Sequence, residues 1–377
     1  MLNSRKKILL VGNLPVTFKV FFEDLIYLLK KNIDVEILTN KKYLKKNNQI
    51  KNIKYFHLPF ERKIKIFIDL YCLIKMTLFL RKNKYDLVIS ITPKSGLISS
   101  IASFLTSTRK KVHIFTGQVW FNKNFFYKNF LILFDKMICV FSKYLICDSK
   151  SQRNFLYEKK INKKKIKVIG SGSICGVDTI KFSKLRNKIK IRRDLNFNKN
   201  DLILIFVGRI NSDKGIHLLL DSFQNIYYKY DNLKLLLVGE DEINIKNLLK
   251  KNYKKITKRI KIVPFTNNVN KFLKISDIFV FPSYREGFGL SVIEALSTGL
   301  PVIVSDTYGL KDSFLNKING LKFKTGSQKS LEKSIINLIK NKKMRLKFSK
   351  NSRPFVLKKF EKKRVINLYR NYFMRLI

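Results

Sequence analysis

Residues 202–215 read LILIFVGRINSDKG, and this stretch decides the fold. An uninterrupted apolar run at 202–207 ends at Gly208, and a new apolar period begins at about Ile216, directly after Gly215. A short apolar run, a glycine-containing turn and a helix, in that order, are typical of the first half of a βαβ unit. The stretch therefore predicts a buried parallel strand followed by a helix.

The same order of strand, loop and helix recurs on both sides of this stretch. A polar segment with several glycines, residues 170–187, separates two series of such units, which predicts two doubly wound α/β domains. We expect an N-terminal domain at 1–185, a second domain at 186–355, and a C-terminal helix at 356–377 that packs back on the first domain. The expected strands are 7–11, 34–38, 87–91, 111–115, 145–148, 166–169, 202–207, 233–238, 260–263, 278–281 and 302–305, and the expected helices include 18–30, 64–80 and 358–375.

The composition limits the class of protein. The chain has 377 residues, 45% of them hydrophobic, which is enough to bury two cores and too apolar for a disordered chain. Its formal net charge of +52 is typical of proteins that bind nucleic acid or anionic membranes. Lysine, asparagine and isoleucine nevertheless crowd the whole chain, as an AT-rich genome produces without functional cause. A solvated lysine surface, a membrane and a nucleic acid are therefore three open interpretations, in that order of preference.

Cysteine and histidine are sparse. The four cysteines form no CxxC pair and the three histidines are scattered, so we expect neither a zinc site nor a disulfide framework. No run of about 18 residues lacks charge, so no transmembrane helix is expected. The apolar run at 8–11 is too short for the core of a signal peptide. These features together predict a cytoplasmic protein.

The loop after residues 202–207 carries two cations, Arg209 and Lys214, near the start of a helix. Free N–H groups, the helix dipole and two positive charges make a suitable site for a diphosphate. A basic loop without function is an equally good interpretation of this loop alone. The glycine spacing of a Walker loop is absent.

Residues 283–295 read SYREGFGLSVIEA and follow the apolar run at 278–281. Glu286 stands in the loop and Glu294 about two turns into the next helix. The flanking glycines allow a ligand to approach the backbone, and a carboxylate accepts hydrogen bonds from sugar hydroxyls without a metal. The alternative interpretation is an acid near a helix start and an acid on a helix surface.

Taken together, these motifs resemble a known enzyme family, the family 4 (group 1) retaining glycosyltransferases with two Rossmann-like domains, the GT-B fold. The resemblance covers residues 202–306 in family order and spacing, and is looser in the N-terminal half, where some segments are similar to enzymes of bacterial surface-polysaccharide synthesis. The matching segments are Gly208-Arg209, Lys214-Gly215, Leu237-Val238-Gly239-Glu240, Pro282-Ser283, Glu286-Gly287-Phe288-Gly289-Leu290, Glu294-Ala295 and Gly299-Leu300-Pro301-Val302 in the second half, and Gly117-Gln118-Val119-Trp120, Asp148 to Arg153 and Gly176-Val177-Asp178 in the first.

The resemblance implies a role for each matching residue. Arg209 and Lys214 would hold the donor diphosphate and stabilise it as the leaving group, and Glu286 would bind hydroxyls of the donor sugar. Glu294 would bind the ribose, and the backbone near Phe265 would read the base. The implied enzyme retains the anomeric configuration and needs no metal and no other cofactor. The remaining donor-binding residues implied by the family pattern are Gly208, Phe288, Gly289 and Leu290.

The acceptor side departs from the family pattern. Many relatives carry a His-Gly pair where this chain has Thr116-Gly117, and their Gly-Gly loop after the first strand is reduced here to Gly12-Asn13. His113 lies inside an expected strand and is interpreted as a packed histidine rather than a catalytic one. The resemblance implies that Gly12, Asn13, Thr116 and Gly117 lie on the acceptor side.

The expected partners are a nucleotide-diphosphate sugar, a glycan or lipid-linked acceptor, and an anionic membrane surface. Residues 121–146 interleave phenylalanine and tyrosine with lysine, as a segment at a membrane interface does, although a core-facing helix with a lysine flank explains them equally well. No nucleic-acid recognition motif is found. The competing hypotheses are a non-catalytic protein that binds nucleic acid or an anionic surface, and another sugar-nucleotide enzyme, an epimerase or a phosphorylase. The sequence leaves open the donor sugar and its base, the acceptor and linkage, and the oligomeric state.

Overall fold

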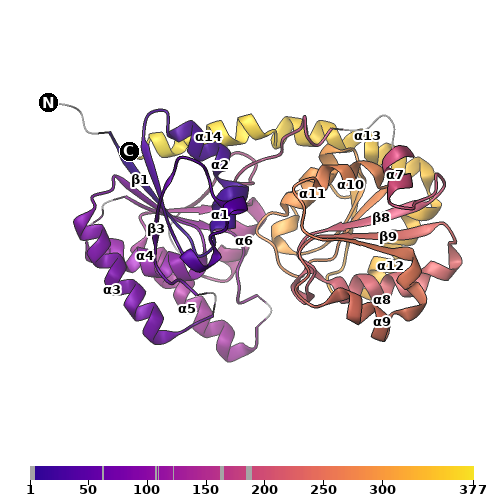
Figure 1. The fold of residues 1–377 in the computed structure, drawn as a ribbon, viewed down its shortest axis with the longest axis horizontal. Coiled ribbons are helices and arrows are strands. Elements are labelled where there is room, and N and C mark those ends of the chain that lie inside the picture. The colour runs from indigo at the N-terminus through magenta and orange to yellow at the C-terminus, as the bar shows by residue number, and fades with distance from the viewer. Residues whose placement is uncertain are drawn as a thin grey trace. The chain divides into compact units, whose positions relative to one another are not determined.

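The computed structural model of the chain describes residues 5–61, 63–106, 108, 110–121, 123–161, 165–183 and 189–377. The chain divides into two compact units (Figure 1). Unit 1 comprises Met1–Gly176 and Lys363–Ile377, and unit 2 comprises Val177–Lys362. None of the helices in the described ranges has the length and apolar content needed to span a membrane.

Unit 1 is built on a parallel sheet of seven strands within the described residues, in the order β3-β2-β1-β4-β5-β6-β7. The chain order reverses between β1 and β4, which pair directly. Such a reversal is the mark of a doubly wound sheet. The strands are β1 (Lys7–Val11), β2 (Asp34–Thr39), β3 (Lys54–His57), β4 (Leu87–Ser90), β5 (Lys111–Phe115), β6 (Tyr144–Cys147) and β7 (Ile166–Val168).

Helices cover both faces of this sheet because its strands present apolar side chains to both. Alternate residues of β1 lie in two different cores: Ile8 and Leu10 pack with α1, α2 and α14, whereas Leu9 and Val11 pack with α3 and α4. Figure 1 shows α2 and α14 on the same side of the sheet. The helices of unit 1 are α1 (Pro15–Phe21), α2 (Glu23–Leu29), α3 (Ile66–Lys82), α4 (Pro93–Leu105), α5 (Phe125–Phe141), α6 (Lys150–Glu158) and α14 (Lys362–Met374).

Unit 2 repeats this design with a parallel sheet of six strands in the described residues, ordered β10-β9-β8-β11-β12-β13. Its reversal lies between β8 and β11. The strands are β8 (Leu202–Val207), β9 (Leu233–Val238), β10 (Ile260–Val263), β11 (Ile278–Phe281), β12 (Val302–Ser305) and β13 (Gly320–Phe323). The helices are α7 (Ile189–Asp194), α8 (Ile216–Ile226), α9 (Ile245–Asn252), α10 (Val269–Ile275), α11 (Leu290–Ser297), α12 (Gln328–Lys340) and α13 (Lys342–Lys359).

The expectation of two doubly wound α/β domains is confirmed. The strands predicted at 202–207, 233–238, 260–263, 278–281 and 302–305 have those bounds in the structure. The helix predicted at 18–30 is divided into α1 and α2, because Phe22 leaves the helical conformation while its ring is buried in the core. Two of the four edge strands of the described sheets, β3 (Lys54–His57) and β13 (Gly320–Phe323), were not predicted.

The boundary predicted between residues 185 and 186 lies outside the described residues. The chain passes from unit 1 to unit 2 between Gly176 and Val177. Residues 177–183, assigned to the first domain from sequence, belong to unit 2, where Val177 and Phe182 lie in the core. The chain returns from unit 2 to unit 1 after Lys362, and we call this second passage the return crossing. There the N–H of Val177 donates to the carbonyl of Phe360 at 2.8 Å, and the N–H of Lys362 donates to the carbonyl of Val177 at 2.9 Å.

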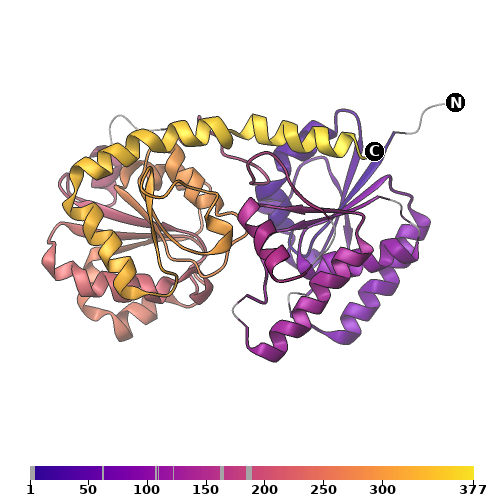
Figure 2. The ribbon, with the colours of Figure 1, turned by 180° about the vertical axis from the view of Figure 1, so that it is seen from behind.

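The segment predicted as one helix, 358–375, is interrupted at this return crossing. Phe360 is fully buried against Phe288 and Phe355 and ends α13, and α14 then begins at Lys362. Figure 2 shows α13 and α14 as successive yellow helices. The apolar side of α14 contributes Val365, Ile366, Tyr369 and Phe373 to the core of unit 1.

A buried polar cluster lies in the centre of unit 1. Lys111 on β5 is almost completely buried, and its ammonium donates to the Ser90 hydroxyl and, at 3.1 Å, to the carbonyl of Val112. His113 is buried beside it, with Nδ1 2.8 Å from Ser90 Oγ, as expected for a packed strand histidine. Within the described residues no carboxylate forms an ion pair with Lys111, and burial lowers the pKa of Lys111 well below its usual value.

Replacing Lys111 with methionine should stabilise unit 1 at neutral pH. Because the folded state lowers the pKa of Lys111, the unfolded chain binds the proton more tightly, and the free energy of unfolding falls as the pH falls below about 10. We expect Lys111→Met to raise that free energy by about 1–3 kcal/mol near pH 7, with the gain shrinking toward pH 10. Urea unfolding at both pH values tests this. A gain that does not depend on pH would contradict the titration argument.

Candidate active site

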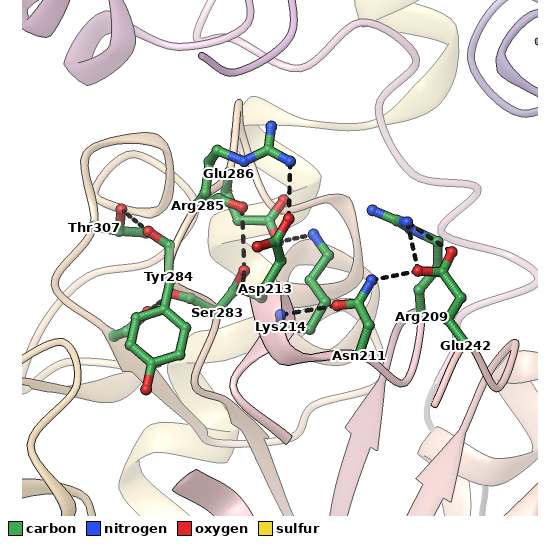
Figure 3. A network of polar contacts seen from close by, with 11 residues as sticks. Arg209, Asn211, Asp213, Lys214, Glu242, Ser283, Tyr284, Arg285, Glu286 and Thr307 are labelled. Atoms are coloured by element: carbon green, nitrogen blue, oxygen red, sulfur yellow. Dashed lines mark hydrogen bonds and ion pairs between the residues drawn. The ribbon is translucent and has the colours of Figure 1, made fainter. Parts of the chain in front are cut away.

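The reversal of strand order in unit 2 is the natural place for a ligand, because the loops after β8 and β11 diverge there from neighbouring strands. These loops are the two motifs that the sequence analysis identified. The first, 208–215, contains a short 3-10 helix, Ser212–Lys214, and enters α8. The second, 282–289, enters α11. Figure 3 shows the polar network that they form.

Backbone contacts hold these two loops together. The carbonyl of Asp213 accepts hydrogen bonds from the N–H of Tyr284 at 2.9 Å and from Ser283 Oγ at 3.4 Å. The Asp213 carboxylate also pairs with Arg285 at 3.3 Å. Gly215 has φ +73°, and a Cβ atom there would lie 2.1 Å from the carbonyl oxygen of Pro282. Only glycine therefore allows the two loops to approach this closely.

Lys214 and Glu286, which are 72 residues apart in the sequence, form a salt bridge across the two loops. Their side chains are largely buried, with 16% and 13% of their surface exposed. Figure 3 shows the ammonium of Lys214 directed at the carboxylate of Glu286. The predicted phosphate-binding cation and the predicted sugar-binding acid thus lie side by side.

Arg209 contacts a residue that the sequence analysis did not single out. Its Nη1 donates to both carboxylate oxygens of Glu242, at 2.7 and 3.0 Å. Glu242 also accepts from Asn211 Nδ2 at 2.6 Å, and Asn211 Oδ1 in turn accepts from the N–H of Lys214 at 3.1 Å. The Glu242 carboxylate, from the loop after β9, therefore contacts the segment 209–214 at two side chains, and this segment carries both cations. In the sequence Glu242 is only one more acid a few residues after an expected strand, so nothing there predicts its contacts with Arg209 and Asn211.

The other predicted donor-binding residues lie at the start of α11. Gly289 precedes α11 in the left-handed conformation, and Leu290 is its first residue, half-buried. The ring of Phe288 is buried edge-on against Phe360, so its backbone rather than its side chain is available to a ligand. Gly208 directly follows β8, and Phe265 lies beyond the end of β10 with an exposed ring.

Glu294, in the middle of α11, is half-buried, and its carboxylate makes no hydrogen bond within the described part of the chain. Burial raises the pKa of Glu294 to about 7, although the nearby ammonium groups of Lys181 and Lys362 lower it in part. A half-buried acid without a hydrogen-bonding partner is unusual, and it is free to accept hydroxyl hydrogen bonds.

The predicted acceptor-side residues lie in unit 1, two of them at the equivalent reversal between β1 and β4 and two after β5, the next strand beyond β4. Gly12 and Asn13 follow β1, and Thr116 and Gly117 follow β5. Asn13 is buried, and its amide oxygen accepts from Thr92 Oγ1 at 2.9 Å, so it joins the loops after β1 and β4. Thr116 is half-buried.

A second buried pair supports the loop that contains Thr116 and Gly117. Trp120 Nε1 donates to Asp135 of α5 at 2.7 Å, and the indole ring stacks on Phe155 of α6. Burial raises the pKa of Asp135 to about 7, and the hydrogen bond from Trp120 opposes this rise. Within the described residues, no group of three or more His, Cys, Asp or Glu side chains is placed to hold a metal ion.

Comparison with known proteins agrees with this geometry. Residues 187–355, almost the whole of unit 2, match the family model described as glycosyl transferases group 1. The capsular polysaccharide biosynthesis glycosyltransferase CapM of Staphylococcus aureus is 32% identical over 339 residues, which are 89% of this chain and 88% of CapM. The chain belongs to the group 1 glycosyltransferases.

A second relative and a solved structure extend the comparison. This glycosyltransferase is 28% identical over 323 residues to the Escherichia coli UDP-Gal:alpha-D-GlcNAc-diphosphoundecaprenol alpha-1,3-galactosyltransferase, covering 82% of this chain and 80% of that enzyme. The crystal structure of Anabaena HepE in complex with UDP and glucose superposes with a TM-score of 0.78 at 18% identity, over 98% of this chain and 100% of HepE. The two Rossmann-like halves are those of the GT-B fold.

Substituting Gly215 should disrupt the junction of the two loops in this glycosyltransferase. Gly215→Ala combines an unfavourable left-handed φ with an overlap against the backbone of Pro282, so we expect a loss of more than about 2 kcal/mol in the free energy of unfolding. Gly326→Ala is the matched control, because Gly326 also has a left-handed φ of +77° but its nearest neighbour is the Tyr284 ring at 3.4 Å. It should lose about 1 kcal/mol. Equal losses in denaturant unfolding would contradict the close approach.

Substituting Glu294 with glutamine should stabilise the enzyme at alkaline pH. The pKa of Glu294 is raised on folding, so its contribution to stability is fully present below the unfolded value of about 4.3 and is lost as the pH rises through about 7. Glu294→Gln should therefore unfold with a free energy about 1–3 kcal/mol above wild type near pH 8 and equal to it near pH 4.5. Urea unfolding across this range measures the difference, and a constant offset would refute the assignment.

Proposed function

We propose that the enzyme transfers a sugar, with retention of configuration, from a nucleoside-diphosphate sugar to a glycan or polyprenyl-diphosphate-linked acceptor in bacterial surface-polysaccharide synthesis. The observation that carries the proposal is the junction of Arg209, Lys214 and Glu286 at the strand reversal of unit 2. Cations suited to a diphosphate stand there beside a carboxylate suited to sugar hydroxyls.

The acceptor part of the proposal is supported by the relatives. CapM is named for capsular polysaccharide biosynthesis, and the Escherichia coli relative is named for transfer to a sugar on diphosphoundecaprenol. Such an acceptor resides at a membrane, so we place the enzyme on the inner face of the cytoplasmic membrane as a peripheral protein. The proposal assigns no nucleic-acid partner to the charge of +52.

In the proposed reaction the bond between the anomeric carbon and the β-phosphate oxygen breaks, and the diphosphate leaves with that bond's electron pair. The acceptor hydroxyl oxygen forms the new bond on the same face of the sugar, and its proton passes to the departing phosphate oxygen. Lys214 and Arg209 stabilise the negative charge that develops on the diphosphate. Glu286 orients the sugar by accepting hydroxyl hydrogen bonds, and no protein nucleophile is used.

The remaining residues hold the donor. Glu294 accepts hydrogen bonds from the ribose hydroxyls, and the backbone of Phe288, Gly289 and Leu290 lies along the phosphates and the sugar. The base lies near Phe265. We further propose that two cationic side chains replace the metal that many sugar-nucleotide enzymes use, so that a chelator leaves the rate unchanged.

Substitutions in the Lys214–Glu286 pair test the proposed function. We expect Lys214→Met and Glu286→Gln each to lower the turnover rate by about 30- to 1,000-fold, because the loss of a charge-assisted contact to the leaving group or sugar costs about 2–4 kcal/mol at the transition state. The measurement is release of nucleoside diphosphate from a panel of nucleotide sugars in the presence of an acceptor extract.

Lys6→Met is the matched control, since Lys6 pairs with Asp86 at 3.0 Å in unit 1, at the start of β1 and not near the carboxyl ends of the strands. Its rate should stay within about 2-fold of wild type, because a surface ion pair contributes little. Thermal unfolding of all three variants separates loss of chemistry from loss of fold. A decrease of only a few-fold in both site variants would refute the proposed roles.

A further inference from the structure

We propose that unit 1 docks on an anionic lipid bilayer through the outer faces of α3 and α5. The inference rests on the proposed function in one respect, because a lipid-linked acceptor gives the bilayer a reason to be the partner. It goes further in naming the surface, which includes α3, a helix outside the aromatic segment that the sequence analysis singled out.

Helix α3 carries a row of exposed apolar side chains along its outer side. Phe67, Leu70, Ile74 and Leu78 recur at intervals of three and four residues, and each is more than half exposed; Phe67 is 88% exposed. The opposite side of α3 buries Cys72, Met76 and Leu80 against the sheet. The helix is therefore apolar on both sides, although among the described residues only the side that faces the sheet packs into a core.

Helix α5 repeats this arrangement. Phe126, Phe130, Leu133 and Val140 are exposed at helical spacing, with Phe126 85% exposed. Its buried side contains Leu131, Asp135 and Ile138. Water-facing rows of this kind on two helices are costly in a soluble protein, and contiguous exposed apolar surface marks an interaction site.

Helix α4 lies between the two helices that carry these rows. It packs against α3 on one side and α5 on the other, and Figures 1 and 2 both show the three helices together on unit 1. At the end of α4, Phe104 is exposed and its ring lies 5.0 Å from that of Phe141 of α5. We call the exposed apolar side chains of α3 and α5, with Phe104, the apolar helix layer.

The charges of these helices favour an anionic partner. The three helices contain two acids, and neither offers a free carboxylate to the outside: Asp69 pairs with Lys94 at 2.9 Å, and Asp135 is buried against Trp120. Exposed basic residues, Lys75, Arg81 and Lys136 among them, lie on the same helices. Lysine and arginine beside exposed aromatic rings match the headgroup region of an anionic leaflet.

A bilayer fits this surface better than a second copy of the chain does. In a symmetric dimer the apolar helix layer would face itself, and the basic residues of both copies would be brought together. For a chain of charge +52 this repulsion is unfavourable, whereas an anionic bilayer turns the same charges into attraction. The helices would lie in the interface rather than cross it.

Vesicle sedimentation with the full chain tests the inference. The vesicles are phosphatidylcholine alone and phosphatidylcholine mixed with phosphatidylglycerol. The variant is Phe67→Ser/Phe126→Ser, and the matched control is Tyr228→Ser/Leu346→Ser, which removes two side chains of unit 2 that are 61% and 62% exposed. We expect wild type to bind the mixed vesicles at least about 10-fold more tightly than the neutral ones, the variant to lose at least about 10-fold on mixed vesicles, and the control to change by less than about 2-fold.

Three outcomes would overturn the inference. They are failure of wild type to bind mixed vesicles, equal losses in the variant and the control, and a wild-type dimer in light scattering that the variant converts to monomer without a change in vesicle binding. The last would assign the surface to a second copy. Thermal unfolding of the variant should match wild type, because the substituted side chains are exposed.

A parallel measurement of nucleoside diphosphate release separates this inference from the proposed function. If no nucleotide sugar supports transfer but the vesicle results hold, the proposed function is wrong and the docking surface stands. If wild type transfers sugar to a detergent-dissolved polyprenyl-diphosphate acceptor but does not bind vesicles, the proposed function stands and the docking surface is wrong.

Discussion

The candidate active site depends on one carbonyl group, that of Asp213. By accepting hydrogen bonds from the backbone of Tyr284 and the hydroxyl of Ser283, it joins the loop after β8 to the loop after β11. The contact is possible because Gly215 leaves no side chain between the loops. Parallel strands with a reversal of order bring the loop starts together, but they do not determine the distance between the loop tips. The Lys214–Glu286 salt bridge is a consequence of this backbone contact.

Much of the fold could be predicted because central parallel strands are buried on both faces. A run such as 202–207 has no polar position and ends at a glycine, so its bounds can be recognised in the sequence. Two of the four edge strands in the described part of the chain, β3 and β13, could not be recognised in this way, because β3 contains only two apolar residues between Lys54 and His57, and β13 begins at a glycine and is interrupted by Lys322. The interruption at Phe360 depends on contacts with Val177, which is far away in the chain and invisible to a local pattern.

The candidate site was predictable by residue type but not by pairing. Arg209, Lys214, Glu286 and Glu294 stand in recognisable loops, and the family resemblance suggests their roles. Nothing in the sequence indicates that Glu242 would brace Arg209 and Asn211, because this contact joins loops that follow different strands. The sequence also does not indicate that the outer side of α3 is exposed, since an apolar helix side that faces water and one that faces a core have similar sequences.

The pairing of both cations with acids has a consequence for selectivity. On a surface of charge +52, inorganic phosphate and other small anions meet lysine almost everywhere. At the loop junction, however, Arg209 is already neutralised by Glu242 and Lys214 by Glu286. A simple anion must break these pairs and leave two carboxylates without partners. A molecule that brings hydroxyl groups together with phosphates can satisfy cations and acids at the same time, so these two ion pairs favour such a molecule over a simple anion.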